Sequence, residues 1–245
     1  MSEKNPQRND FFIISPEDRE WRVTKPRGGK EYDKEAYEQR RKEIDARDLD
    51  GKVKATTSSL RQKEIRDPSN LYFVIQIEEE ATASKIQNAL EKLSATVHSH
   101  LDREHKLLLV SVSEQQLSTY EDEGLPRVIK EPLVDFRELM PWEQISKELE
   151  GEEWVRTPRP VILHLIPNIE TQLATSYLDR LSRYFESMKC KVLPVSHPDD
   201  GMLLAHIDRK VAEDLLKRAN YVFKIHGLPS GILSHVRSPK RISRR

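Results

Sequence analysis

The chain has 245 residues, of which 36% are hydrophobic and 33% are charged, and its 41 Lys and Arg residues equal its 41 Asp and Glu residues in number. Because the net charge is zero, no global field draws the chain to nucleic acid or to an anionic membrane, so any binding must be local. This length, with apolar residues gathered in short runs, favours two small domains, and no run approaches the roughly 20 apolar residues that span a bilayer.

Cysteine usage and the first residues indicate the compartment. Cys190 is the single cysteine, which excludes an intramolecular disulfide framework and a cysteine-cluster metal site. The N-terminal stretch contains no apolar segment of signal-peptide length. We therefore expect a soluble, cytoplasmic protein that does not engage a membrane.

Residues 1–70 are predicted to form a charged N-terminal arm. A short apolar patch at 11–14 is followed by a loop at Gly28 and Gly29 and then by a charged stretch. Residues 32–47 contain many helix-forming residues but few large apolar ones. The arm is therefore expected to be partly disordered or to form a solvated helix.

From Leu71 the sequence alternates between strand and helix patterns. Ser113 is expected to cap the second helix of this region, with Gln116 three residues later, and Gly124 to end that helix. The order is β-α-β-β-α-β, which predicts a ferredoxin-like domain over residues 71–138. Its predicted elements are strands at 71–80, 95–101, 106–112 and 127–136 and helices at 82–93 and 114–123.

An acidic linker at 139–158, with a short helix predicted at 142–149, precedes a second domain of the same order at 159–228. Asn168 and Asp208 are expected to cap its two helices. A basic tail follows at 229–245. The predicted elements of the second domain are strands at 159–167, 190–195, 202–207 and 221–227 and helices at 169–189 and 209–219.

The predicted fold class is therefore α+β, with two tandem ferredoxin-like (βαββαβ) antiparallel-sheet domains. In each domain both helices are expected to cover one face of the sheet. The opposite face is then free to dock RNA, a small effector or another protein, and the fold alone does not choose among them.

An enzyme is the first functional class to weigh. The stretch His197-Pro198-Asp199-Asp200 resembles the zinc site of the N-acetylglucosaminyl deacetylase-like hydrolases, but only over these four residues, and the same letters with Gly201 suit a turn between two strands. We interpret it as that turn, so no metal site is predicted.

Other candidate chemistry is equally weak. His98 and His100 stand two positions apart on a predicted strand and are expected to be a solvent-facing pair rather than a metal site. Ser113 and Ser234 have no His and Asp context for a nucleophile. The chain contains no Gly-rich phosphate loop, so no nucleotide or other cofactor is expected. No catalytic residue is therefore predicted.

An RNA-binding or RNA-processing protein built from tandem ferredoxin-like domains is the alternative function. Such a module needs aromatic residues on its middle strands, and the strands at 106–112 and 202–207 contain none. A tandem pair also resembles the CRISPR-repeat endonucleases, but their Gly-rich C-terminal loop has no counterpart here. The basic tail, with Arg237, Lys240 and Arg241, keeps contact with nucleic acid open.

The third class is a protein-interaction module. Residues 72–97, 107–131 and 201–226 resemble the subtilisin-type propeptide and protease-inhibitor domains, in which an apolar strand, a Ser- or Asp-capped helix and a closing strand follow one another. The two copies cover 71–133 and 159–226. The N-terminal arm resembles the region before the protease domain in cytoplasmic bacterial subtilases of defence-type operons.

The resemblance implies binding without catalysis. In that family the open sheet face packs on helices of the protease, and the tail after the last strand lies in the substrate cleft as an added strand. The expected function is thus an inhibitor, chaperone or regulatory partner of a subtilase-type serine protease. The expected partner-binding residues are Gly227, Leu228, Pro229, Ser230, Gly231, Ile232 and Leu233.

Overall fold

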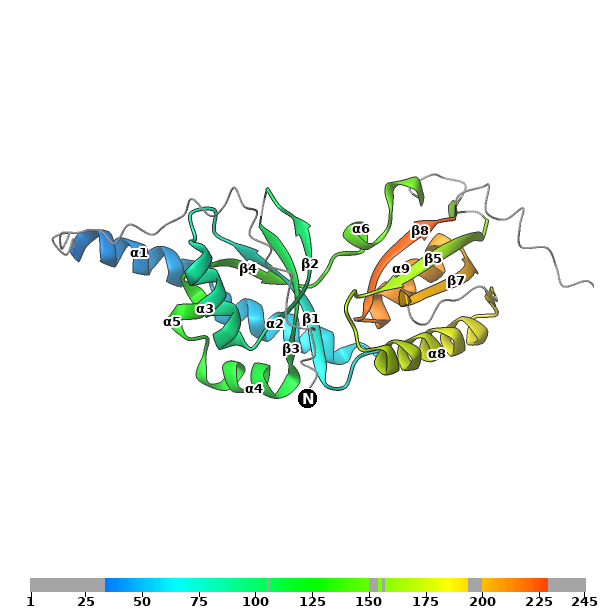
Figure 1. The fold of residues 1–245 in the computed structure, drawn as a ribbon, viewed down its shortest axis with the longest axis horizontal. Coiled ribbons are helices and arrows are strands. Elements are labelled where there is room, and N and C mark those ends of the chain that lie inside the picture. The colour runs from blue at the N-terminus through cyan, green and yellow to red at the C-terminus, as the bar shows by residue number, and fades with distance from the viewer. Residues whose placement is uncertain (1–33, 105, 150–153, 156, 194–199, 229–245) are drawn as a thin grey trace, which may run out of the picture. The chain divides into compact units, whose positions relative to one another are not determined.

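The computed structural model describes residues 34–104, 106–149, 154–155, 157–193 and 200–228 (Figure 1). The chain divides into one unit that ends at Lys42 and a second that begins at Glu43, and both sheets belong to the second unit. The predicted α+β class is confirmed, because the described residues form two four-stranded antiparallel sheets with helices.

The first domain contains a sheet with the strand order β2-β3-β1-β4. β1 is paired with β3 from Asn70 opposite Ser113 to Gln76 opposite Leu107. Two helices connect these strands as predicted, α3 (Ala83–Leu93) and α4 (Glu114–Glu123). The strands are β1 (Asn70–Ile77), β2 (Thr96–Asp102), β3 (Leu107–Ser113) and β4 (Leu133–Arg137).

The second domain repeats this arrangement with the order β6-β7-β5-β8. The longest helix of the pair, α8 (Thr171–Ser187), follows β5, and α9 (Arg209–Arg218) follows β7. The repeat in the sequence is therefore a repeat of topology. The strands are β5 (Arg159–Leu165), β6 (Lys191–Val192), β7 (Met202–Ile207) and β8 (Val222–Gly227).

Local side chains begin two of these helices as predicted. The Ser113 hydroxyl accepts a hydrogen bond from the Gln116 backbone N–H at 3.2 Å, and the Asp208 carboxylate accepts one from the Val211 N–H at 2.9 Å. Each contact satisfies a donor that the first helical turn leaves unpaired. Gly124, with φ of 80°, ends α4 in a backbone conformation that favours glycine.

Three local predictions are wrong. Residues 127–136 are not one strand, because 127–130 form the short helix α5 (Arg127–Lys130) and β4 starts after Pro132, which lacks a backbone donor. The linker helix is interrupted into α6 (Pro141–Gln144) and the 3₁₀ turn η3 (Lys147–Leu149). Asn168 is not a cap: its φ is 60°, and Glu170 precedes the first residue of α8.

The linker is broken because it adds to the edge of the second sheet. Ile145 pairs with Ile225 of β8, and the Ser146 N–H donates to the Ile225 carbonyl at 2.9 Å. Trp154, also in the predicted linker, is buried and donates from Nε1 to the Ile207 carbonyl at 3.0 Å. The linker is thus part of the second domain's core.

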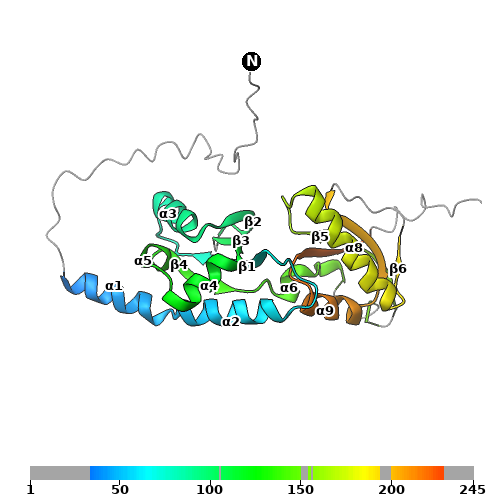
Figure 2. The ribbon, with the colours of Figure 1, turned by 90° about the horizontal axis from the view of Figure 1, so that it is seen from below.

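Two helices lie in the predicted N-terminal arm, α1 (Lys34–Ala46) and α2 (Leu49–Gln62). The side chain of Asp48 accepts from the Gly51 N–H and caps α2. α2 contacts β4 and α4, which Figure 2 shows from below. Its buried residues are Leu49, Val53, Thr56, Thr57 and Leu60. The first domain therefore packs α2 in addition to the two helices that the ferredoxin-like pattern supplies.

Two apolar cores result. On the helix side of the first sheet, Leu71, Phe73 and Ile75 of β1 pack with residues of α2, α3 and α4. In the second domain, Val161 and Leu163 of β5 pack with residues of α8 and α9. Along β5 the buried positions alternate, as the pleat requires, whereas β1 is buried at consecutive positions and so on both faces.

The outer face of the first sheet is not free, which corrects the expectation for this domain. Tyr72, Val74 and Leu109 lie on that face with side chains 5%, 1% and 0% exposed. They belong to the same apolar core as Tyr177 and Leu181 of α8. Because those side chains are apolar, covering them with the second domain removes their surface from water.

A short connecting segment at 63–69, between α2 and β1, ties the two domains together. The Ile65 N–H donates to the Arg218 carbonyl at 2.9 Å, and the Asn220 N–H donates to the Ile65 carbonyl at 3.2 Å. The Asp67 N–H donates to the Asn220 side chain at 3.1 Å. The segment thus pairs with the chain between α9 and β8.

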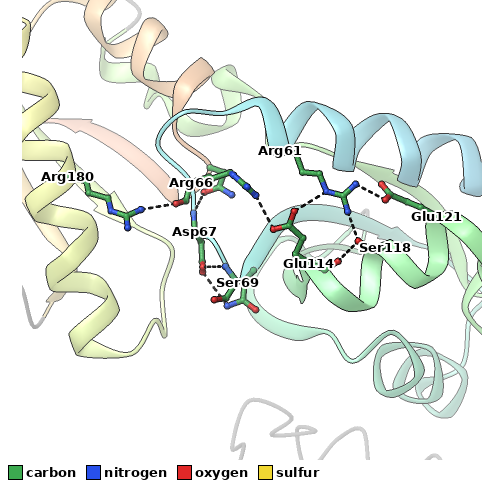
Figure 3. A network of polar contacts seen from close by, with 10 residues as sticks. Arg61, Arg66, Asp67, Ser69, Glu114, Ser118, Glu121 and Arg180 are labelled. Carbon is green, nitrogen blue, oxygen red and sulfur yellow. Dashed lines mark hydrogen bonds and ion pairs between the residues drawn. The ribbon is translucent and has the colours of Figure 1, made fainter.

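Arginines extend this link on the surface, as Figure 3 shows. Arg61 contacts Glu114 at 3.1 Å and Glu121 at 2.6 Å, and Arg66 contacts the other Glu114 oxygen at 3.0 Å. Arg180 of α8 donates to the Arg66 carbonyl at 3.0 Å. The polar contacts therefore run without interruption from α4 to α8.

Candidate functional site on the outer face of the second sheet

The second sheet keeps an outer face that neither apolar core includes. The strands alternate, so Val161, Leu163 and Leu165 of β5 point into the core and the residues between them point outward. Leu204 of β7 is 7% exposed, and His206 beside it is exposed. We call this surface the outer face of the second sheet. Its residues are Ile162, His164, Met202, Leu204, His206, Lys224 and His226.

A cavity of about 280 Å³ opens at the β5–β8 side of this face. A second cavity, of about 430 Å³, shares Phe223, Lys224 and His226 with it and reaches His100 of the first domain. The first cavity is lined by His164, Pro167, Asn168, Asp200, Gly201 and the three shared residues, among others. The outer face thus combines apolar, imidazole, ammonium and carboxylate groups.

His164 and His226 are the most closely associated pair of titratable groups on this face. Their ring centroids lie 5.2 Å apart and their planes are at 88°. Burial and then the neighbouring His226 lower the pKa of His164, and burial and then the Lys224 ammonium lower the pKa of His226. Both rings are therefore favoured in the neutral form at pH 7.

Lys224 lies on the same face, and its ammonium group is engaged in a hydrogen bond. Its Nζ atom donates to the Glu143 carbonyl at 2.6 Å, so the ammonium is fixed beside α6. A carboxylate, Glu148 of η3, partly opposes the effect of Lys224 on His226. The electrostatics of the site thus come from three elements, β5, β8 and the linker.

The expectation of a solvent-facing His98 and His100 pair is wrong. The pairing of β2 with β3 shifts register between Val97 and Ser99, so His98 is the extra residue of a bulge. His98 is buried and His100 is exposed. One His98 ring nitrogen lies 2.8 Å from the Pro167 carbonyl and the other 2.8 Å from the Ser111 hydroxyl. His98 is thus a structural residue between the domains.

Only part of the His197–Asp200 motif can be placed. Asp200 and Gly201 line the cavity beside His164, and Gly201 has φ of 62°, as suits a turn. His197 and Asp199 lie outside the described residues. Among the residues that the structure describes, no three His, Cys, Asp or Glu side chains are grouped to hold a metal ion.

The expected partner-binding segment is described only at its start. Gly227 ends β8, and the Leu228 N–H donates to the Pro160 carbonyl at 3.2 Å, which continues the pairing with β5. The residues from Pro229 to Leu233 lie outside the described part of the chain, as do Ser234 and the basic tail. Ser113 is the N-cap of α4.

The histidine pair was missed by sequence reasoning. A signal existed, since Ile162 and His164 alternate with buried residues on one strand and Lys224 and His226 alternate on another. Alternation alone places each residue on a face but does not say which strands are neighbours. The strand register was needed to bring His164 and His226 together.

In the described part of the chain, no helix is both long enough and apolar enough to cross a bilayer. In the three comparisons with known proteins, no family model, no curated protein and no solved structure matches this chain.

Proposed function

We propose that this chain is a protein-binding module without catalysis, and that its partner is a serine protease of the subtilase type. It would serve that protease as a propeptide-like inhibitor, chaperone or regulatory partner. The observation that supports this best is the outer face of the second sheet. The outer face of the first sheet is already covered, so the second domain carries the docking role.

The composition of the outer face suits a protein partner. Ile162 and Met202 are half-buried apolar side chains at neighbouring positions of paired strands, and Leu204 lies opposite Ile162. Polar groups surround them, with His206 and Lys224 at the sides. An apolar centre with a polar rim is the usual anatomy of a protein interface.

The end of β8 also supports the proposal. The bond from Leu228 to Pro160 keeps the backbone extended beyond β8. In subtilase propeptides the segment after the last strand adds to the substrate cleft through main-chain hydrogen bonds. Residues 229–233 would take that part here, with Gly227 and Leu228 at its start.

A cytoplasmic site of action is part of the proposal. Cys190 is the single cysteine of the chain, and it is free. Burial, the larger cause, and the Asp208 carboxylate both raise its pKa, so its thiol is not activated. A fold that needs no disulfide suits a reducing compartment.

Two truncations and an inhibition assay test the proposal. The full chain is mixed with purified subtilases, and residual protease activity is measured against chain concentration. Truncation after Leu233 should leave inhibition unchanged, whereas truncation after Leu228 should weaken it about tenfold or more, because the added strand is lost. Absence of inhibition, of a complex and of cleavage would refute the proposal.

A surface variant tests the sheet face separately. Ile162→Glu places a charge at the apolar centre of the outer face and should abolish the complex, because the charge would be desolvated. Val128→Glu, at a 40% exposed residue of the first domain, is the matched control and should bind normally. Equal binding by both variants would show that the outer face is not the docking surface.

The alternative function, RNA binding, predicts a different result for the full chain and the two truncated chains. Binding to single-stranded RNA that weakens steeply with salt, and that is lost on truncation after Leu233, would assign the function to the basic tail. That tail includes Arg237, Lys240, Arg241, Arg244 and Arg245. A gel shift across salt concentrations gives the answer.

A further inference from the structure

His164 and His226 are diagonal neighbours across a strand pair. His164 stands opposite Lys224, and His226 stands opposite Ile162. The two imidazoles therefore project from one face of the sheet, within reach of each other. Backbone hydrogen bonds of β5 and β8 hold both Cα positions, so the pair sits on rigid elements.

The spacing of the two rings is that of a metal chelate. Imidazole nitrogens bind Zn²⁺ at about 2.1 Å, and at a tetrahedral angle this places two ring centres about 5 Å apart. The ring centroids of His164 and His226 lie 5.2 Å apart. We propose that His164 and His226 form a binding site for a divalent transition-metal ion, a role that goes beyond the protein-binding function.

Within the described residues, neither ring of this pair is engaged by the protein. Among the hydrogen bonds of the described residues, none involves a ring nitrogen of His164 or His226. Both rings are of intermediate exposure, unlike the buried His98, whose nitrogens contact Pro167 and Ser111, so an ion from solution can reach them.

The surroundings define the kind of site. The adjoining cavity of about 280 Å³, which Asp200 also lines, leaves room for water on the ion, and no third protein ligand joins the two histidines among the described residues. Lys224 is the opposing charge, although its Nζ atom is bonded to the Glu143 carbonyl. With two protein ligands, the remaining coordination positions are filled by water or by a group of another molecule.

The ligand class follows from the donor atoms. Imidazole nitrogen suits Zn²⁺, Cu²⁺ and Ni²⁺, whereas Mg²⁺ and Ca²⁺ require oxygen ligands. The site is therefore selective for the first group. This assignment is independent of the four-residue motif at 197–200, because its ligands lie on β5 and β8.

Isothermal titration of the full, tag-free chain with ZnCl₂ and with NiCl₂ tests the site. His164→Gln and His226→Gln should each weaken binding about tenfold or more, because removing a ligand costs at least as much as removing its supporting contacts. His206→Gln, on the same face of β7, is the matched control and should bind as the wild type does. MgCl₂ should give no heat of binding.

Two further measurements keep the result clear if a variant is less stable. Urea unfolding without metal shows whether each variant is folded, and only folded variants are compared. Lys224→Met should strengthen zinc binding, because it removes a positive charge beside the ion. Absence of saturable binding by the wild type, or wild-type affinity in both His164→Gln and His226→Gln, would overturn the assignment.

Discussion

Nδ1 of His98 lies 2.8 Å from the carbonyl oxygen of Pro167, so a side chain of β2 in the first domain is hydrogen-bonded to the turn before α8 in the second. A carbonyl oxygen only accepts, which requires Nδ1 to carry the proton. Nε2 lies 2.8 Å from the Ser111 hydroxyl. Burial lowers the pKa of His98 and so favours the neutral ring, in which Nε2 accepts from that hydroxyl.

This contact predicts that stability falls in mild acid. Burial, the main cause, lowers the pKa of His98 below its ordinary value of 6.5, against the opposite effect of the Pro167 hydrogen bond. Below pH 6.5 the unfolded chain takes up a proton that the folded chain does not, so the free energy of unfolding decreases as the pH falls toward the folded-state pKa. Below that pKa no further loss occurs.

Urea unfolding at pH 7.5, 6.5 and 5.5 measures this effect. In His98→Gln the residue no longer titrates, so the loss of stability between pH 7.5 and 5.5 should be smaller than in the wild type. The remaining loss reflects His164 and His226, whose pKa values are also lowered. A loss in His98→Gln equal to that of the wild type would contradict the prediction.

Asp67 in the connecting segment is predicted to be a stability determinant. Its carboxylate is 1% exposed and accepts from the Ser69 N–H at 2.7 Å and from the Tyr72 hydroxyl at 3.0 Å. Asp67→Ala leaves these donors without an acceptor, at about 1–3 kcal/mol for each buried group. Asp67→Asn keeps one acceptor oxygen and should lose less, which urea unfolding followed by circular dichroism can measure.

The two linker tryptophans should differ sharply. Trp154 is 1% exposed, whereas Trp142 is 70% exposed. Trp154→Ala should cost about 3–5 kcal/mol of unfolding free energy, because it opens a cavity in the second core. Trp142→Ala should change stability by less than about 0.5 kcal/mol. Similar losses in both variants, measured by chemical unfolding, would show that the linker is not part of that core.

Helix α2 is predicted to be essential to the first domain. Leu60 is 2% exposed and packs in the first core, so Leu60→Ala should cost about 2–5 kcal/mol. Ser58 on the same helix is exposed, and Ser58→Ala should be close to neutral. If Leu60→Ala were as stable as Ser58→Ala in thermal unfolding, α2 would not contribute to the stability of the first domain.

Sequence patterns were reliable where the cause is local. Ser113 and Asp208 cap the helices they were expected to cap, because capping needs only a side-chain oxygen near the first turn. Asn168 failed as a cap because its side chain is directed elsewhere: its amide donates to the His98 carbonyl at 3.5 Å. The competing contact comes from a strand 70 positions earlier, which a local pattern does not contain.

The sequence by itself determined the βαββαβ order of each domain and the repeat of that order, because these follow from side-chain periodicity along a short stretch. Only the tertiary structure decided that Tyr72 and Leu109 are covered by the second domain, that His98 bonds to Pro167, and that His164 stands beside His226. These contacts depend on strand register and domain packing, which are set by burial across residues far apart in the chain.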